Sequence, residues 1–379
     1  MEFSFSEDQN ELRRTARRFL EVASSEGRVR TAMETERGYD PATWAQLSEE
    51  LAWTALTIPE EYGGLGMSYL DLHPLMEELG RALLCAPFLS TVGLGANALL
   101  LGGSEAQKQL YLPRIAAGET RATLAFAEKN GKMDAAGIGA TYARNESGYL
   151  LSGDKSYVLD GHTADLLIVA ARSKRSAGTE GVSLFLVPND AEGLKRAWLP
   201  TMDQTRRLAS VELRDVTVSN DALLGDEGRG WAICEKTLDL ARIALAAEQV
   251  GAAEMCLELS VEYAKVRQQF GRPIGSFQSI KHKCADMLML VESARSAAFY
   301  ASSLATQGGE GLEEAASCAK AYCSDAFFHC AAETIQIHGG IGFTWEHPAH
   351  LYFKRAKATE SLFGDAAFHR ERVAEKMGL

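Results

Sequence analysis

Apolar positions along the chain follow a helical period at both ends and a strand-like pattern in the middle. In the first part, apolar side chains such as Leu12 and Ala16 recur at the spacing of one helix face. Later the apolar runs become short, and turn residues separate them roughly every 8 to 15 positions. From Gly228 long helical patterns return, joined by short turns. The pattern predicts a multidomain α+β fold: an N-terminal α-helical domain at 1–120, a central antiparallel β-barrel or sandwich at 121–226, and a C-terminal four-helix bundle at 227–379.

The same pattern indicates where single elements lie. A serine cap precedes the first helix, and Pro41 suits the first position of another. Further N-terminal helices are expected at 72–84, 88–101 and 105–117. Strands are expected at 123–127, 148–155, 164–171, 182–187, 194–199 and 209–218. Long helices of the bundle are expected near 228–265, 279–306, 312–338 and 346–377.

Composition and charge exclude several classes of protein. A hydrophobic content of 46% with 24% charged residues is that of a globular chain. The net charge of -12 argues against a nucleic-acid surface, although a local basic pocket for a small anion remains compatible with it. The seven cysteines form no CxxC pair and no zinc spacing, so we expect buried thiols in a reducing, cytoplasmic protein.

One segment is long and uncharged enough to raise the question of a membrane span. Residues 82–104 contain no charged side chain, and this length could cross a bilayer. Pro87, Asn97 and four glycines dilute the segment, so a helix buried in a soluble core is the better interpretation. The first residues lack the basic and apolar regions of a secretory signal.

Two motifs in the C-terminal part carry candidate chemistry. Residues 267–278, with the sequence RQQFGRPIGSFQ, form a turn between two helices. Arg267 and Arg272 suit phosphate oxygens, but they would also suit the negative end of a helix dipole. Residues 335–344, with the sequence IQIHGGIGFT, place three glycines in four positions at a helix end. A cap needs only one glycine, so a backbone site for an anionic ligand is favoured, and the histidine is a packing or capping residue.

Together these two motifs strongly resemble those of the acyl-CoA dehydrogenases. The α–β–α order is similar over essentially the whole chain, and PEEYGGLG at 59–66 and LSGDK at 151–155 support the resemblance. It implies that FAD binds between the central domain and the C-terminal bundle, with a neighbouring subunit completing the site. By resemblance, Arg267 and Phe270 hold the diphosphate and adenine end, Gln278 makes a further cofactor contact, Gln336, Gly339 and Gly340 receive the FAD diphosphate of the adjacent subunit, and Arg242 lies near the acyl-CoA pocket.

The resemblance also implies a reaction and partners. A carboxylate removes the α-proton of an acyl-CoA thioester while the β-hydrogen leaves as hydride to flavin N5. The implied acceptor is an electron-transferring flavoprotein, and the implied assembly is a homo- or hetero-oligomer, a dimer or a tetramer. Neither a nucleic acid nor a membrane span is expected.

The sequence departs from the family where the catalytic base is expected. The usual glutamate position is Phe363, and the position that some relatives use instead is Ala241. Asp365 and Glu248 are the two candidate replacements within the chain. Asp365 would also suit the N-cap of the last helix, and Glu248 would also suit an ion pair across the bundle. A third possibility is that the chain has no base and works with a related chain that supplies one.

A second departure concerns the flavin contacts of the central domain. Ala127 stands where the family commonly has a threonine hydroxyl, and Leu159 stands at the threonine of a Trp-Ile-Thr stretch. The sequence thus leaves three hypotheses open: an FAD-dependent acyl-CoA dehydrogenase, a non-catalytic subunit that completes the FAD site of a hetero-oligomer, and a relative that uses a non-CoA substrate or oxygen.

Overall fold

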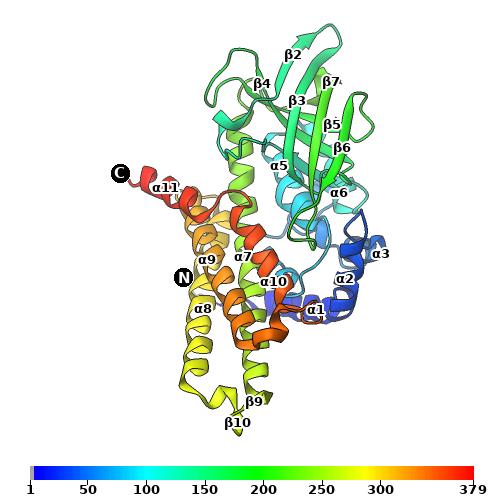
Figure 1. The fold of residues 1–379 in the computed structure, drawn as a ribbon. Coiled ribbons are helices and arrows are strands. Elements are labelled where there is room, and N and C mark those ends of the chain that lie inside the picture. The colour runs from blue at the N-terminus through cyan, green and yellow to red at the C-terminus, as the bar shows by residue number, and fades with distance from the viewer. Residues whose placement is uncertain (1–3) are drawn as a thin grey trace. The chain divides into compact units, whose positions relative to one another are not determined.

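The computed structural model describes residues 4–379, and their contacts group the chain into two compact units. One unit contains the residues up to Thr31, together with Tyr69–Leu84 and Arg242–Leu379. The other contains Ala32–Ser68 and Cys85–Ala241. The N-terminal helices are therefore divided between the two units. The predicted multidomain α+β class, with helices before and after a central sheet, is confirmed (Figure 1).

The first unit is helical. Its elements are α1 (Glu7–Ala23), most of α2 (Glu26–Glu34), α4 (Tyr69–Arg81), most of α7 (Gly230–Val266), α8 (Gln278–Gln307), α9 (Leu312–His338), η8 (Gly339–Phe343), α10 (Ala349–Ser361) and α11 (Ala366–Lys376). Small side chains from α7, α8 and α9 form its core, including Ala246, Ala298 and Ala319. Alanine at these positions lets the long helices in Figure 1 pack closely along their length.

Helices α4 and α7 cross at two glycines. A Cβ atom on Gly251 of α7 would lie 1.8 Å from the carbonyl oxygen of Glu77. A Cβ atom on Gly80 of α4 would lie 1.9 Å from the carbonyl oxygen of Glu248. Both glycines are therefore required by the close approach of the two backbones.

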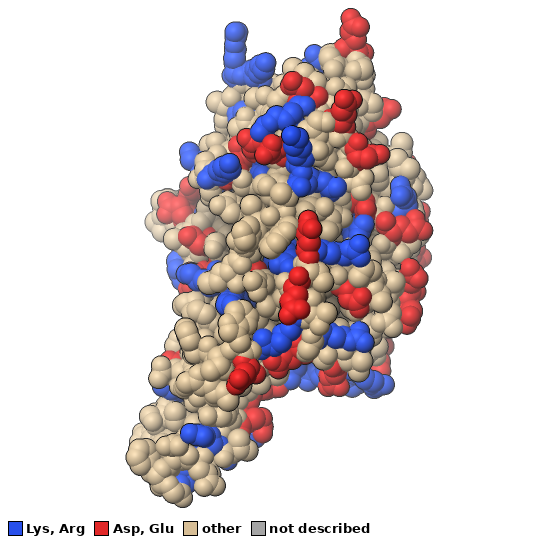
Figure 2. All heavy atoms as spheres, turned by 45° about the vertical axis from the view of Figure 1, so that its right-hand side comes forward, with Lys and Arg blue, Asp and Glu red and all other residues tan. Residues whose placement is uncertain are grey.

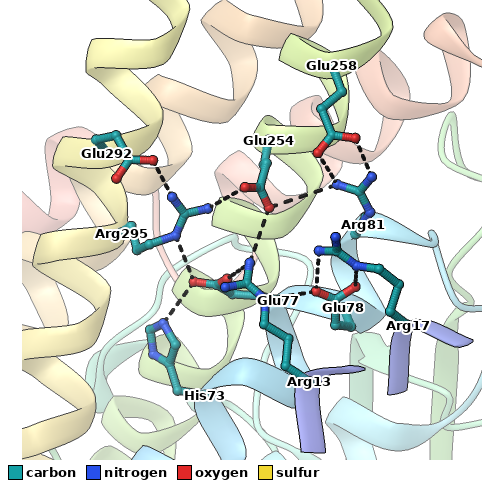
Figure 3. A network of polar contacts seen from close by, with 10 residues as sticks. All are labelled: Arg13, Arg17, His73, Glu77, Glu78, Arg81, Glu254, Glu258, Glu292 and Arg295. Carbon is teal, nitrogen blue, oxygen red and sulfur yellow. Dashed lines mark hydrogen bonds and ion pairs between the residues drawn. The ribbon is translucent and has the colours of Figure 1, made fainter. Parts of the chain in front are cut away.

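A network of charged side chains joins α1, α4, α7 and α8 in this unit (Figure 3). Its members are Arg13, Arg17, His73, Glu77, Glu78, Arg81, Glu254, Glu258, Glu292 and Arg295. Glu77 is only 1% exposed, and its carboxylate pairs with Arg13 at 2.8 Å and Arg295 at 3.3 Å. Burial alone would raise the pKa of Glu77, but the hydrogen bond and charge of His73 and the charges of Arg295 and Arg13 lower it to about 2. The network therefore holds the buried carboxylate of Glu77 in its ionised form.

The second unit is built on one eight-stranded sheet. Its strands are β1 (Ala122–Ala125), β2 (Thr141–Asn145), β3 (Gly148–Leu159), β4 (Leu166–Ser173), β5 (Val182–Pro188), β6 (Leu194–Leu199), β7 (Leu208–Ser219) and β8 (Leu223–Leu224). The hydrogen-bonded order is β6-β7-β3-β2-β4-β5-β8, with β1 beside β4. Its helical elements are α3 (Pro41–Ala45), η1 (Gln46–Glu50), η2 (Trp53–Ala55), η3 (Glu60–Tyr62), η4 (Leu89–Ala96), α5 (Asn97–Gly102), α6 (Glu105–Ala116), η5 (Ala135–Gly137) and η6 (Asn220–Ala222).

The expectation of a purely antiparallel sheet is wrong at two strand pairs. Strand β4 pairs in parallel with both β1 and β2. Parallel neighbours need a long connection, and the chain between β1 and β4 supplies one, which includes β2 and β3. Strand β2 was not expected from the sequence, because its last two residues are exposed and only Tyr142 is fully buried. A strand with so few buried side chains leaves little apolar alternation to recognise.

Two helical predictions also need correction. The segment expected as one helix near 346–377 is two helices, α10 and α11, because the chain turns at residues 362–365. The segment expected at 88–101 is the π-helical η4 followed by α5. Within residues 4–379, no helix is both long and apolar enough to cross a membrane. The same described residues contain no cluster of three or more His, Cys, Asp or Glu side chains that could hold a metal ion.

Candidate functional site

The predicted turn between α7 and α8 contains a short β-hairpin. Strand β9 (Gln268–Gln269) pairs antiparallel with β10 (Arg272–Pro273), and the short 3₁₀ turn η7 (Ile274–Ser276) leads into α8. The two residues at the tip, Phe270 and Gly271, both have positive φ angles, 54° and 77°. Such a two-residue turn favours Asn-Gly, and an aromatic residue with positive φ is uncommon. The hairpin therefore keeps a residue that its own backbone geometry does not favour.

The side chains of this hairpin are open to solvent in the helical unit. Phe270 is 91% exposed, and its ring meets that of Phe277 edge to face with 6.0 Å between centroids. The Arg272 guanidinium carbon lies 4.1 Å from the centre of the Phe277 ring. Among the described residues, the Arg267 guanidinium has no hydrogen-bonding or ion-pair partner. In Figure 2 the end of the helical unit that bears this hairpin is mostly uncharged, with isolated basic side chains. The hairpin thus presents aromatic faces and guanidinium donors in an otherwise neutral region.

The second predicted motif lies where α9 ends. Gly339 caps the helix with a φ of 63°, and a Cβ atom on Gly339 or Gly340 would meet no other atom within 4 Å. The backbone at these glycines is therefore approachable from outside. The preceding His338 is buried, its Nδ1 lies 2.7 Å from the Thr334 carbonyl oxygen, and its ring stacks on Tyr263 of α7 at 4.3 Å. Burial lowers the pKa of His338. These contacts agree with the sequence interpretation of this histidine as a packing residue.

The stacking of His338 on Tyr263 brings the two motifs to the same end of the helical unit. Tyr263 lies in the last turn of α7, directly before the hairpin. Gln278 at the start of α8 and Gln336 at the end of α9 are both exposed. The structure therefore places exposed amide, guanidinium and aromatic groups of the first motif and an open glycine backbone of the second within one unit. All six residues that the sequence predicts to contact the cofactor are exposed to solvent.

Replacing Phe270 with asparagine tests whether this hairpin is built for a ligand. Asparagine is favoured at a positive φ before glycine, so Phe270→Asn is expected to stabilise the protein by roughly 0.5–1 kcal/mol. The same change removes an exposed aromatic face and is expected to weaken FAD binding. Thermal unfolding and a flavin titration measure the two effects. Equal FAD affinity in both proteins would contradict a role for Phe270 in cofactor binding.

Phe363, which the resemblance to the family aligns with the catalytic glutamate, lies in the turn between α10 and α11. Phe363 has a φ of 63° and is only 3% exposed. Gly364 follows with a φ of 105°, and a Cβ atom there would lie 2.4 Å from the Phe368 ring. The Phe363 carbonyl oxygen accepts a hydrogen bond of 3.0 Å from Nε of the buried Arg242. The other usual position, Ala241, is fully buried. Both positions are therefore apolar in the folded chain.

Asp365 forms the N-cap of α11. Its carboxylate accepts a hydrogen bond of 2.8 Å from the backbone N–H of Phe368, and the residue is exposed. A base for the α-proton needs a dry pocket, whereas this carboxylate is exposed and occupied by the start of a helix. The geometry matches the capping role that the sequence offered as the alternative.

Glu248 lies on α7 and is 4% exposed. Its Oε1 lies 2.8 Å from Nη1 of Arg355 on α10, and Arg355 is itself 1% exposed. A buried ion pair of this kind is costly to break, because removing one partner leaves an uncompensated charge. Glu248 therefore joins α7 to α10 through the ion pair that the sequence analysis gave as its alternative role.

A change at Asp365 separates capping from catalysis. Asp365→Ala is expected to destabilise the protein by about 1 kcal/mol through loss of the N-cap. Asp365→Asn retains a capping side chain and serves as the control. Neither change is expected to alter the rate at which an acyl-CoA bleaches the flavin of the assembled enzyme. A rate lowered in both variants would restore Asp365 as the base.

In the second unit, a buried ion pair organises the loop that carries Ala127. Nζ of Lys155, a fully buried residue, lies 2.6 Å from Oε1 of Glu128 and 3.2 Å from the Phe126 carbonyl oxygen. The same carboxylate oxygen accepts the backbone N–H groups of Gly139 and Ala140 at 2.8 and 2.9 Å. Burial lowers the pKa of Lys155, and Glu128 opposes that shift. These hydrogen bonds fix the conformation of the loop. Ala127 and Leu159, at the positions where the family has hydroxyl groups, are both buried.

Sequence reasoning missed one residue beside the Phe363 turn, Lys320 of α9. It is fully buried, and its Nζ lies 3.2 and 3.1 Å from the carbonyl oxygens of Glu360 and Gly364 and 2.9 Å from Oγ of Ser324. The available signal was a single lysine in an otherwise apolar stretch of helix. That signal says nothing about which distant segment the side chain reaches.

Comparison with known proteins identifies the class to which this fold and site belong. Models of the acyl-CoA dehydrogenase N-terminal, middle and C-terminal domains match residues 6–119, 123–216 and 228–378. Acyl-CoA dehydrogenase IpdE2 of Mycolicibacterium smegmatis is 37% identical over 359 residues, which cover 95% of each chain. The chain belongs to the acyl-CoA dehydrogenase family.

Two solved structures support the same class. Butyryl-CoA dehydrogenase from Megasphaera elsdenii matches with a TM-score of 0.92 at 30% identity over 100% of both chains. The ChsE4–ChsE5 complex from Mycobacterium tuberculosis matches with a TM-score of 0.90 at 26% identity, over 100% of this chain and 99% of that chain. Members of this family are flavoprotein oxidoreductases that act on CH–CH bonds and bind FAD.

The residues of the helical unit fit an FAD diphosphate. Gly339 and Gly340 leave open space where a side chain would otherwise stand, so a diphosphate can approach the backbone closely there, although the Gly339 N–H itself donates to the Ile335 carbonyl oxygen. Arg267 has no partner among the described residues and carries donors whose geometry suits phosphate. Phe270 offers a free ring face of the kind on which a nucleobase stacks. The chemistry of these residues therefore fits the cofactor.

Proposed function

We propose that this chain is one subunit of an FAD-dependent acyl-CoA dehydrogenase, in which a related chain supplies the catalytic carboxylate. The assembly desaturates an acyl-CoA thioester between its α- and β-carbons. The observation that carries the proposal is the buried Phe363, which occupies the usual base position. The two carboxylates that could replace the missing base are engaged elsewhere, Asp365 in a helix cap and Glu248 in an ion pair with Arg355.

In this proposal the chain's own residues bind the cofactor and shape the pocket. Arg267 and the backbone at Gly339 and Gly340 hold diphosphates, Phe270 stacks on the adenine end, and Gln278 and Gln336 add amide contacts. When bound, the flavin supplies the acceptor for the hydride that leaves the substrate's β-carbon. Phe363 and Ala241 contribute apolar surface rather than a base. Arg242 holds the backbone of the Phe363 turn beside the acyl-CoA pocket.

The similarity to the ChsE4–ChsE5 complex supports an assembly of two related chains. The self-sufficient homo-oligomer is the competing arrangement. An electron-transferring flavoprotein is the proposed acceptor of the electrons, as it is by resemblance to the family.

Co-expression tests the proposed assembly. The chain is produced alone and together with a related acyl-CoA dehydrogenase chain from the same source that has glutamate at the position matching Phe363 or Ala241. We expect the two chains to co-purify in a fixed ratio with bound FAD, and we expect the pair to oxidise acyl-CoA. A lone chain that forms a homo-oligomer with a full complement of FAD and turns over acyl-CoA would contradict the proposal.

A further inference from the structure

The turn that carries Phe363 is held by cations from two other helices. Helix α10 ends at Ser361, and the last carbonyl groups of a helix have no partner within it. Lys320 of α9 donates to the carbonyl oxygens of Glu360 and Gly364, at 3.2 and 3.1 Å. Arg242 of α7 donates to the carbonyl oxygen between them, that of Phe363, at 3.0 Å. The backbone on both sides of position 363 is therefore fixed from outside the turn.

This backbone needs such support. Phe363 and Gly364 have consecutive positive φ angles, and for an aromatic residue this conformation is a strained one. A strained conformation persists only when its surroundings determine it. The hydrogen bonds of Lys320 and Arg242 go to main-chain atoms, so they do not depend on which side chain stands at 363.

Burying the amine of Lys320 at this place carries a desolvation penalty. It is fully buried, and among the residues the structure describes it forms no ion pair with a carboxylate. Burial, with the nearby charge of Arg242, lowers its pKa to about 7. A methionine side chain could replace the lysine side chain here at a lower desolvation cost. Methionine could not donate the three hydrogen bonds that Lys320 makes to Ser324 and to the two carbonyl oxygens.

We infer that Lys320 is a positioning residue, which holds the 360–364 turn so that whatever side chain stands at position 363 is presented in one fixed direction. The inference rests on the proposed function, because it treats position 363 as the place of the base in chains that carry one. In this chain the held side chain is Phe363. The turn is thereby a preformed holder that would accept a carboxylate without rearrangement of the backbone.

Hydrogen exchange tests the holding role without reference to activity. In the full chain, Lys320→Met is expected to accelerate amide exchange in the 361–366 segment by about tenfold or more, while the melting temperature changes little because a buried charge has also been removed. Lys357→Met is the matched control. Lys357 pairs with the side chain of Glu360 at 2.8 Å and is half exposed, but it does not contact the turn's carbonyl oxygens. If the Lys320→Met variant does not fold, Lys320→Gln replaces it in the exchange experiment.

A kinetic experiment tests the positioning role. In a Phe363→Glu chain loaded with FAD, adding Lys320→Met is expected to lower kcat for acyl-CoA by about 100-fold, as for a catalytic group displaced by about 1 Å, with KM and FAD content unchanged. If Phe363→Glu itself gives no activity, the placement of the base at position 363 has failed, and the exchange experiment still decides the role of Lys320. Unchanged exchange at 361–366 in Lys320→Met, or an unchanged kcat in the double variant, would overturn the inference.

Discussion

Phe363→Glu is expected to give the isolated, FAD-loaded chain the ability to bleach its flavin with an acyl-CoA under anaerobic conditions. The backbone of the turn is already held by Arg242 and Lys320, so the new side chain replaces Phe363 without changing the backbone. A positioned general base typically contributes about 10²–10⁴-fold to a rate. We therefore expect the bleaching rate to rise by a factor in this range, measured by stopped-flow absorbance with a panel of acyl-CoA thioesters.

Phe363→Gln is the matched control for this experiment. Glutamine has nearly the shape of glutamate but cannot remove a proton. We expect the glutamine variant to remain as slow as the parent chain. Equal acceleration by both substitutions would mean that lost bulk, rather than a gained carboxylate, accounts for the effect. Failure of both to bleach would contradict the placement of the base at position 363.

Glu77→Gln is expected to destabilise the chain by about 3 kcal/mol at pH 7. A pKa lowered from 4.5 to about 2 corresponds to that free energy, and removing one partner of a buried ionic cluster typically costs 3–5 kcal/mol. The variant also leaves Arg13 and Arg295 facing a neutral amide in the network of Figure 3. Urea unfolding followed by circular dichroism measures the difference.

The pH dependence of this difference has a defined sign. Because the pKa of Glu77 is lower in the folded chain, its stabilising contribution is fully present above pH 4.5 and is lost as the pH falls through about 2. The gap between parent and variant should therefore shrink on acidification across this range. Glu292→Gln is the control, since the Glu292 side chain is 57% exposed and pairs only at the edge of the network. It is expected to cost less than about 1 kcal/mol. A gap that stays constant down to pH 3 would contradict the role given to Glu77.

Much of the fold was predictable because its signals are local. The hairpin at 267–278 contains glycine and proline at its turn, and the glycines of the second motif end α9 as the sequence indicated. Six strands were expected close to their observed positions, because their apolar runs are bounded by turn residues. The class of the fold followed from the order of these signals along the chain.

The remainder depends on contacts between distant residues. The parallel pairing of β4 with β1 and β2 is decided by which strands meet in the sheet, and no short stretch of sequence encodes it. The ionic network joins residues of four helices, and each member alone looks like a surface charge. The break between α10 and α11 depends on two positive φ angles that Lys320 and Arg242 support from elsewhere in the chain.

The candidate site divides in the same way. Its cofactor motifs are contiguous, so Arg267, Phe270, Gly339 and Gly340 could be selected from the sequence. The apolar residues at positions 241 and 363, where the resemblance to the family places the base, could also be read there. What the structure adds is the engagement of the two substitutes, because a helix cap at Asp365 and an ion pair at Glu248 are properties of the folded chain.

We propose that this chain holds FAD but contributes no base of its own. The most direct measurement is anaerobic mixing of the purified chain, reconstituted with FAD, with a panel of acyl-CoA thioesters, alone and after assembly with a related glutamate-bearing chain. We expect the flavin to keep its oxidised spectrum in the lone chain and to bleach only in the assembly. Bleaching of the lone chain's flavin at the rate of the assembly would contradict it.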